Sequence, residues 1–175
     1  MSKLRRLTEK TISARKGGHY GLFTTSDLAL LLNEPKSSNF SKLLHKATKA
    51  SVLTNVCKGI YINPLMPPDS KGVLENIALL LHWDKFLYIS LESQLSYLGI
   101  ISQVLINHLT VMTTGRSGKV ETIYGVIEFT HTNHSIESLN GHIYFDPDIG
   151  IFRAKKDKAI RDLNRVGRNL QMLEE

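Results

Sequence analysis

The strongest amphipathic pattern in the chain lies between residues 37 and 62. Phe40, Leu43, Leu44 and Ala47 follow the i, i+3, i+4, i+7 spacing, which predicts a helix over about 40–50 with one buried face. The remaining positions carry three lysines and no carboxylate, whereas a solvated helix usually mixes both signs. The polar face of this helix is therefore basic, and it comprises Ser41, Lys42, His45, Lys46 and Lys49.

Two short β-prone runs follow this helix. Residues 52–56 and 60–62 are separated by Cys57-Lys58-Gly59, which predicts a tight hairpin with a lysine at its tip. Cys57 is interpreted as a small turn residue, because no histidine is placed to activate its thiol.

Two further helices are predicted before the basic one. Thr24 and Asp27 have the spacing of an N-cap pair, so a helix begins there and ends at Asn33-Glu34-Pro35. A weaker apolar stripe over residues 4–12 predicts a first helix that ends at Gly17-Gly18.

Three helices and a basic-tipped hairpin are typical of a winged helix-turn-helix. In that motif the recognition helix enters the major groove, and a hairpin wing can contact phosphate. The alternative interpretation is a small mixed domain with a solvated basic face. The first interpretation predicts DNA contacts from Ser38, Asn39, Ser41, Lys42, His45, Lys46, Lys49 and Lys58, with one or more of Arg5, Arg6 and Arg15 of the first helix touching the backbone.

A proline-rich stretch divides the chain. Residues 63–72 hold three of the five prolines, which predicts a linker and two domains, 1–66 and 67–175. The sequence therefore predicts an α+β fold, with an N-terminal winged helix-turn-helix domain followed by a small mixed α/β domain that has a mostly antiparallel sheet.

The second domain is predicted from alternating apolar runs and turns. An apolar helix is expected from Val73, a strand over 86–89, and a helix capped by Ser90 that buries Leu98. Five β-like runs follow between residues 109 and 152. A last helix is expected from about Lys155, with buried positions Ile160, Leu163, Val166, Leu170 and Leu173.

The net charge of +6 is concentrated in the first domain. Residues 1–70 hold 11 Lys and Arg against 4 Asp and Glu, whereas residues 71–175 hold 11 against 12. Because DNA binding draws much of its affinity from neutralised phosphates, this asymmetry predicts a polyanion partner for the N-terminal domain. The last helix carries a second basic stripe, a candidate surface for a protein partner or nucleic acid: Lys158, Arg161, Arg165 and Arg168.

Composition points to a soluble, cytoplasmic protein. No apolar run approaches the ~20 residues that cross a bilayer, and the N-terminus lacks the apolar region of a signal peptide. A single cysteine excludes an internal disulfide and suits a reducing compartment.

Two possible chemical sites are set aside. Gly115-Arg116-Ser117-Gly118 lacks the spacing of a phosphate loop and is interpreted as a hairpin turn. His131, His134 and His142 have no accompanying cysteine and are interpreted as scattered polar residues rather than zinc ligands. We therefore expect no catalytic site, no metal, no cofactor and no enzymatic activity.

Four segments resemble one protein family. Residues 23–29 and 58–64 resemble the N-terminal winged-helix domain of AbiEi-type antitoxins, which belong to bacterial type IV toxin–antitoxin and abortive phage-infection systems. Residues 88–101 and 154–163 are similar to a strand-then-helix segment and a late helix start of the same family.

The resemblance implies a specific function. It implies an antitoxin that represses its own operon by binding promoter repeats, and a C-terminal domain that counters a nucleotidyltransferase-like toxin, usually without a stable complex. The alternative is a stand-alone winged-helix regulator, or an RNA-binding regulator, whose C-terminal domain mediates protein interaction.

Overall fold

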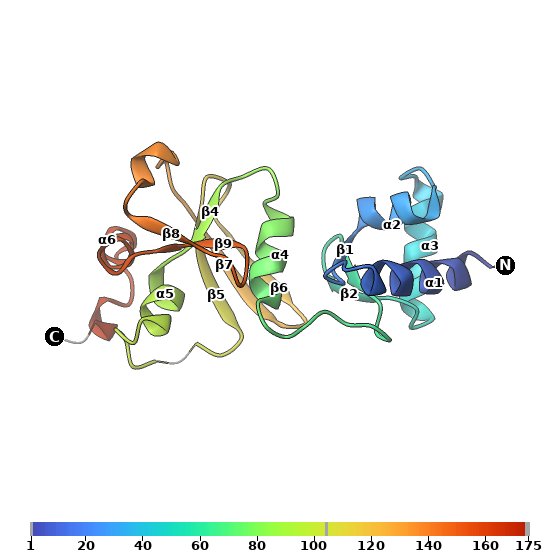
Figure 1. Ribbon diagram of the computed structural model, residues 1–175, viewed down its shortest axis with the longest axis horizontal. Coiled ribbons are helices and arrows are strands. Elements are labelled where there is room, and N and C mark those ends of the chain that lie inside the picture. The colour runs from blue at the N-terminus through green and yellow to red at the C-terminus, as the bar shows by residue number, and fades with distance from the viewer. Residues whose placement is uncertain (1, 104, 174–175) are drawn as a thin grey trace. The chain divides into compact units, whose positions relative to one another are not determined.

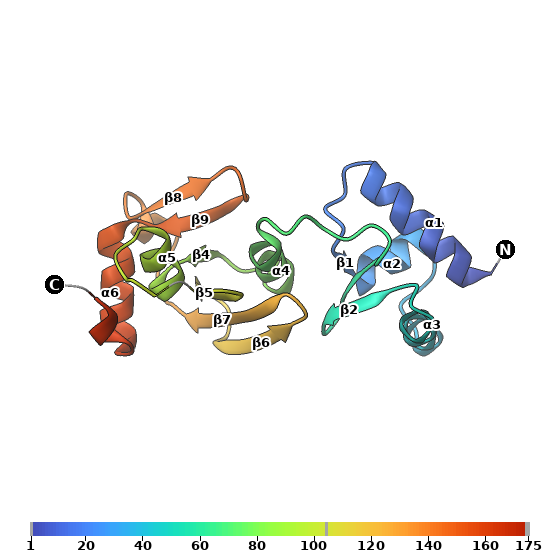
Figure 2. The same cartoon turned by 90° about the horizontal axis from the view of Figure 1, so that it is seen from below.

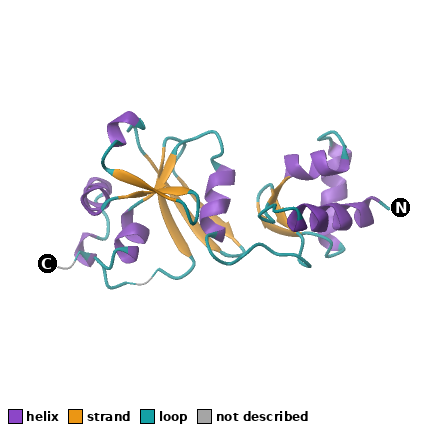
Figure 3. Cartoon of the chain, viewed as in Figure 1, coloured by secondary structure: helices purple, strands orange, loops and turns teal. Residues whose placement is uncertain are grey.

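The computed structural model describes residues 2–103 and 105–173, and it has an α+β fold. The chain divides into two compact units, Met1–Val73 and Leu74–Glu175. Within the described ranges each unit combines helices with one sheet (Figure 3).

Three helices build the first unit: α1 (Lys3–Lys16), α2 (Thr25–Leu32) and α3 (Ser38–Lys49). The predicted cap of α2 is confirmed as a reciprocal capping box. The Asp27 backbone N–H donates to Thr24 Oγ1 at 3.1 Å, and the Thr24 backbone N–H donates to Asp27 Oδ2 at 2.7 Å. Ser37 caps α3 by accepting from the backbone N–H of Phe40 at 3.2 Å.

A three-stranded antiparallel sheet completes this unit, in the order β1 (Phe23–Thr24), β3 (Ile60–Ile62), β2 (Thr54–Cys57). The predicted hairpin is confirmed, with Lys58 and Gly59 between its strands. Gly59 has φ +79°, a left-handed conformation that glycine adopts without strain. The sequence interpretation of Cys57 was wrong, because this residue ends strand β2 and is buried, and its burial raises the pKa of the thiol.

The core of the first unit collects the apolar stripes of all three helices. Leu7 of α1, Leu28 and Leu32 of α2, and Phe40 and Leu44 of α3 form one buried cluster. The cluster is completed by Phe23, Ala29, Ala47 and Leu53. Figure 2 shows α1, α2 and α3 beside the hairpin strand β2. The buried face predicted from the amphipathic spacing is confirmed, because every apolar position of the α3 stripe packs in this core or at its margin.

Part of the proline-rich stretch is held against the first unit. The Tyr20 hydroxyl donates to the backbone carbonyls of Asp69 at 2.9 Å and Lys71 at 3.0 Å. Arg15 contacts the carboxylate of Asp69 at 3.2 Å, and Pro68 is buried. These contacts explain why the division between the compact units falls after Val73, beyond the prolines.

The second unit is built on a six-stranded mixed sheet in the order β6-β7-β5-β4-β9-β8. Three neighbouring pairs are antiparallel, and two, β5 with β7 and β4 with β9, are parallel. The strands are β4 (Leu87–Ile89), β5 (His108–Thr113), β6 (Gly118–Thr122), β7 (Gly125–His131), β8 (Ile143–Asp146) and β9 (Ile151–Ala154).

Helices lie on both faces of this sheet (Figure 1). On one face α5 (Leu91–Tyr97) and α6 (Lys156–Val166) cover Tyr88 and Met112 in a shared buried cluster. On the other lies α4 (Val73–Leu81), with His82 stacked on Phe129 at 4.0 Å between ring centroids. A 3-10 helix, η1 (Glu137–Leu139), precedes β8, and a second, η2 (Leu170–Met172), follows α6.

Several expectations for this unit were wrong in detail. The 115–118 segment is not a hairpin turn, because β5 pairs with β7 and β6 lies beyond β7 at the sheet edge. Leu98 is 38% exposed rather than buried, since α5 ends at Tyr97. The last helix ends at Val166, because Gly167 takes a left-handed φ of 70° that stops it.

Candidate nucleic-acid interface

The polar face of α3 is exposed along its whole length. All seven positions predicted to face a groove are exposed, whereas Phe40, Leu44 and Ala47 on the opposite face are at most 3% exposed. The seven exposed positions are Ser38, Asn39, Ser41, Lys42, His45, Lys46 and Lys49.

The acids of the first unit are engaged elsewhere. Residues 1–70 contain four carboxylates. Asp27 belongs to the capping box, and the others pair with Arg5, Lys3 and Arg15 at 2.9, 2.7 and 3.2 Å. The ion pairs among residues 2–73 therefore leave Lys42, Lys46, Lys49 and Lys58 without a carboxylate. Their positive charge is uncompensated within the described part of this unit.

Lys58 lies at the tip of the β2–β3 hairpin. Its side chain is exposed, and the strand pairing is irregular between Asn55 and Cys57. The Asn55 side-chain amide bridges this irregularity by donating to the carbonyls of Cys57 at 2.9 Å and Ile60 at 3.3 Å. The Asn55 amide therefore links the two strands beside the tip that carries Lys58.

One or more of the three arginines of α1 were predicted to contact DNA backbone, and the structure gives each an intramolecular partner. Arg5 pairs with Glu9 one turn away. Arg6 donates to the carbonyl of Leu32 at 3.4 Å, at the end of α2. Arg15 donates to the carbonyls of His19 and Pro67. Their contacts therefore serve the fold of the unit, with Arg5 the most exposed of the three.

One cation near this face was missed by sequence reasoning. Lys36 is exposed in the turn before α3, and its ammonium donates to Ser26 Oγ at 3.1 Å. The available signal in the sequence was the position of this lysine between two predicted helices. It extends the positive face toward the start of α3.

The second basic stripe is not one exposed surface. Lys158 is 5% exposed and pairs at 2.5 Å with Asp162, which is 1% exposed. Arg168 lies beyond the end of α6 and pairs with Glu92 at 3.1 Å and with Glu128. Burial alone would lower the pKa of Arg168, but its bonds to these two carboxylates raise it. Of the four predicted residues, Arg161 and Arg165 alone are exposed.

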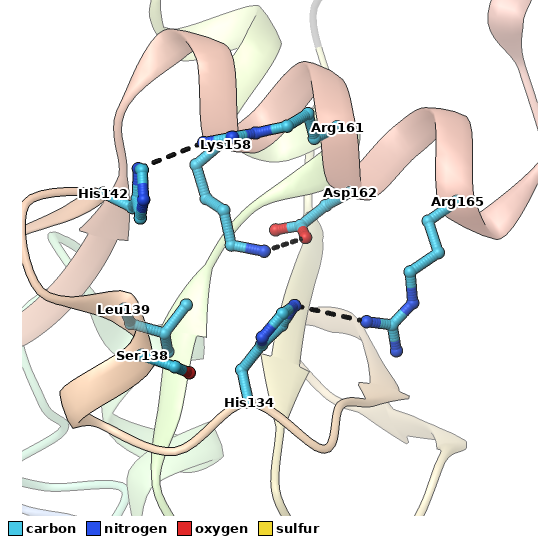
Figure 4. Close-up of a pocket in the computed structure, with 8 residues that line it drawn as sticks. All are labelled: His134, Ser138, Leu139, His142, Lys158, Arg161, Asp162 and Arg165. Carbon is cyan, nitrogen blue, oxygen red and sulfur yellow. Dashed lines mark hydrogen bonds and ion pairs between the residues drawn. The ribbon is translucent and has the colours of Figure 1, made fainter.

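These two arginines border a pocket of about 190 Å³ between α6 and the segment that contains η1 (Figure 4). Arg161 donates to His142 Nδ1 at 3.0 Å, and Arg165 donates to His134 Nε2 at 3.4 Å. Lys158 and Asp162 project from α6 into its inner part, and Ser138 and Leu139 line the opposite side.

The three histidines set aside as scattered do not all lie apart. His134 and His142 line the pocket, while His131 bonds the carbonyl of Gly115 at 2.7 Å and the side chain of Asn133. Within residues 2–103 and 105–173, no three His, Cys, Asp or Glu side chains are grouped closely enough to hold a metal ion. In the same ranges, every helix is too short or too polar to cross a bilayer.

No protein-family model matches the chain, and a search of curated proteins gives no match.

Proposed function

We propose that the first unit is a winged helix-turn-helix domain that binds double-stranded DNA. Helix α3 enters the major groove, and the β2–β3 hairpin is the wing that places Lys58 on a phosphate. The observation that carries this proposal is the exposed, uncompensated lysine face of α3 opposite its buried apolar stripe. Lys42, Lys46, Lys49 and Lys58 provide the phosphate contacts, with Lys36 beside them.

Two kinds of contact are expected from this face. The lysines neutralise phosphates, so the four of them should give a slope of roughly −3.6 for log affinity against log salt. Asn39 and Ser41 lie in the first turns of α3, where amide and hydroxyl groups reach base edges. Charge should therefore set the affinity, and these polar groups the sequence preference.

The test is fluorescence anisotropy with duplexes that tile the region upstream of the protein's own gene, measured over a salt series. The double variant K46A/K49A should bind more weakly, and its slope should be shallower by about 1.8. The matched control is K155A/K156A, which removes two exposed lysines from the second unit and should retain the slope. Equal affinity of K46A/K49A and the unmodified protein would refute the assignment of α3.

A second set of variants separates the recognition of base edges from the neutralisation of phosphates. Asn39→Ala and Ser41→Ala should change which duplex is preferred while leaving the salt slope intact. A uniform loss of affinity on all duplexes would instead assign these residues to the backbone. Tighter binding to RNA of the same sequence than to DNA would favour the RNA-binding alternative.

We further propose that the protein is a non-catalytic antitoxin of a type IV toxin–antitoxin operon, acting in the cytoplasm as its own repressor. The support is the resemblance of residues 23–29, 58–64, 88–101 and 154–163 to AbiEi-type antitoxins. The last two segments meet in the fold: Asp162 accepts hydrogen bonds from Tyr88 at 3.1 Å and Ser90 at 2.7 Å. The residues that carry this part of the resemblance therefore share one buried network.

Co-expression tests the antitoxin proposal. A nucleotidyltransferase-like reading frame that adjoins the gene should arrest growth when expressed alone, and the full chain should relieve the arrest. Residues 70–175 should relieve it without the first unit, whereas K46A/K49A in the full chain should still do so. Arrest that persists with the full chain would leave a stand-alone winged-helix regulator, whose second unit mediates protein interaction.

A further inference from the structure

The pocket beside α6 has an excess of positive charge. Asp162 supplies a negative charge, but Lys158 pairs with its Oδ1, while Tyr88 and Ser90 donate to its Oδ2. Both carboxylate oxygens are thus occupied, and the Lys158–Asp162 pair is neutral. Among the described residues Arg161 and Arg165 have no carboxylate partner, so the pocket retains two positive charges.

Each of the two arginines donates a hydrogen bond to one ring nitrogen of a histidine. An arginine remains protonated in proteins, so the ring nitrogen that accepts from it carries no proton. His142 accepts at Nδ1 and His134 at Nε2, which leaves His142 Nε2 and His134 Nδ1 as N–H donors. Burial and the nearby charges of Lys158 and Arg165 lower the pKa of His134, in agreement with a neutral ring.

We propose that this pocket binds a phosphate monoester group, through the guanidinium groups of Arg161 and Arg165 and the free ring N–H groups of His134 and His142. Each arginine uses one N–H on its histidine, so further donors of its planar fork are available for phosphate oxygens. All the free groups are donors, which suits an acceptor-only ligand of charge near −2.

The size of the pocket restricts the ligand. Sites for drug-sized molecules span about 300–1,000 Å³, so a pocket of about 190 Å³ takes a phosphate group rather than a whole nucleotide. The rest of a ligand would extend past the exposed side chains of Arg161 and Arg165 into solvent. The phosphate can therefore belong to a small metabolite or to the end of an oligonucleotide.

Isothermal titration of the full chain with inorganic phosphate, adenosine 5′-monophosphate and a 5′-phosphorylated single-stranded oligonucleotide tests the proposal. We expect saturable binding of phosphate, with R161Q/R165Q roughly 10- to 100-fold weaker, because each of its two substitutions removes a charge-assisted hydrogen bond. The conservative R161K/R165K should recover part of the affinity, since it restores charge without the fork. R116Q/K119Q, which removes two exposed cations outside the pocket, should bind as the unmodified protein does.

The arms of the experiment distinguish the ligand sources. Tighter binding of the 5′-phosphorylated oligonucleotide than of its 5′-hydroxyl form, in K46A/K49A as well, assigns the pocket to nucleic-acid ends. Equal binding of phosphate and the mononucleotide, with no gain from the oligonucleotide, assigns it to small phosphates. Absence of saturable binding by any probe, or equal binding by R161Q/R165Q with an unchanged melting temperature, overturns the proposal.

Discussion

Asp162 illustrates how a single buried carboxylate organises the second unit. It accepts from Tyr88, Ser90 and Lys158, which belong to β4, the residue after it, and α6. Burial raises the pKa of Tyr88, and the neighbouring Asp162 raises it further, so the phenol stays a donor. Removing one partner from such a network leaves a buried polar group unsatisfied, which costs more than the net contribution of one hydrogen bond.

The segment that resembles a phosphate loop contains Gly115, which packs closely against His82. A Cβ at Gly115 would lie 2.8 Å from His82 Nδ1, closer than packed atoms approach. The same His82 nitrogen is 2.9 Å from Thr113 Oγ1, and its ring stacks on Phe129. Gly115 is therefore required for close packing rather than for holding a ligand.

The partly buried His82 should make stability depend on pH. Burial is the largest influence on it and lowers its pKa below the ordinary value of about 6.5. The unfolded chain then takes up a proton first as the pH falls, so the stabilisation present above about pH 6.5 is lost on acidification. Thermal unfolding monitored between about pH 8 and pH 5 should show a declining melting temperature that is less steep in His82→Asn.

Two comparisons isolate the titration of His82. At about pH 8 the imidazole is neutral in both states, so a difference between the proteins there reports packing alone. A residual decline in His82→Asn is expected, because the pKa of His134 is lowered too, by burial and by the neighbouring cations. Identical slopes in the two proteins would contradict the role given to His82.

At the scale of elements, the residue at which a helix ends determines which charged side chains lie on its exposed face. Gly167 stops α6, so Arg168 leaves the helical stripe and reaches Glu92 and Glu128. Burial alone would raise the pKa of Glu128, but Arg168 and His108 lower it. The same periodicity that placed four cations on one helix face therefore misassigned Arg168, because the helix does not continue to it.

The capping box of α2 should contribute measurably to the stability of the first unit. Asp27→Ala removes the acceptor for the Thr24 N–H and hydroxyl groups, so we expect the free energy of unfolding to fall by about 1 kcal/mol. Urea denaturation followed by circular dichroism measures it. Ser13→Ala, an exposed position of α1, is the control and should change stability by less than about 0.5 kcal/mol. A loss in Asp27→Ala no larger than that of the control would contradict the role given to the capping box.

At the scale of the whole molecule, the two units differ in charge. Residues 1–73 carry 12 Lys and Arg against 4 Asp and Glu, and residues 74–175 carry 10 against 12. In the first unit the acids are used for a cap and three ion pairs, and the α3 face stays positive. In the second, cations and acids meet in partly buried pairs such as Arg153 with Asp146 at 2.7 Å. Exposed lysines without a carboxylate partner therefore gather on α3 in the first unit, whereas several cations of the second unit form partly buried ion pairs.

Local patterns of the sequence predicted most elements of the first unit, but not the short strand β1 or the burial of Cys57. Helical spacing, the Thr24–Asp27 box and the glycine-containing hairpin act over a few residues, so they predict α2, α3 and the β2–β3 pair directly. The basic face of α3 follows from the same spacing. The strand runs of the second unit were also recognisable, but their parallel pairing of β5 with β7 was not, because it joins strands that are not consecutive.

Only the tertiary structure decided which partner each charged side chain contacts. Arg15 forms an ion pair with Asp69. Arg168 forms one with Glu92, which lies 76 residues earlier in the chain. No local pattern specifies such pairs. The pocket likewise needs His134 and His142 brought against α6 by the sheet topology. Periodicity determines which way a side chain points from its own element, whereas its partner depends on how distant elements pack.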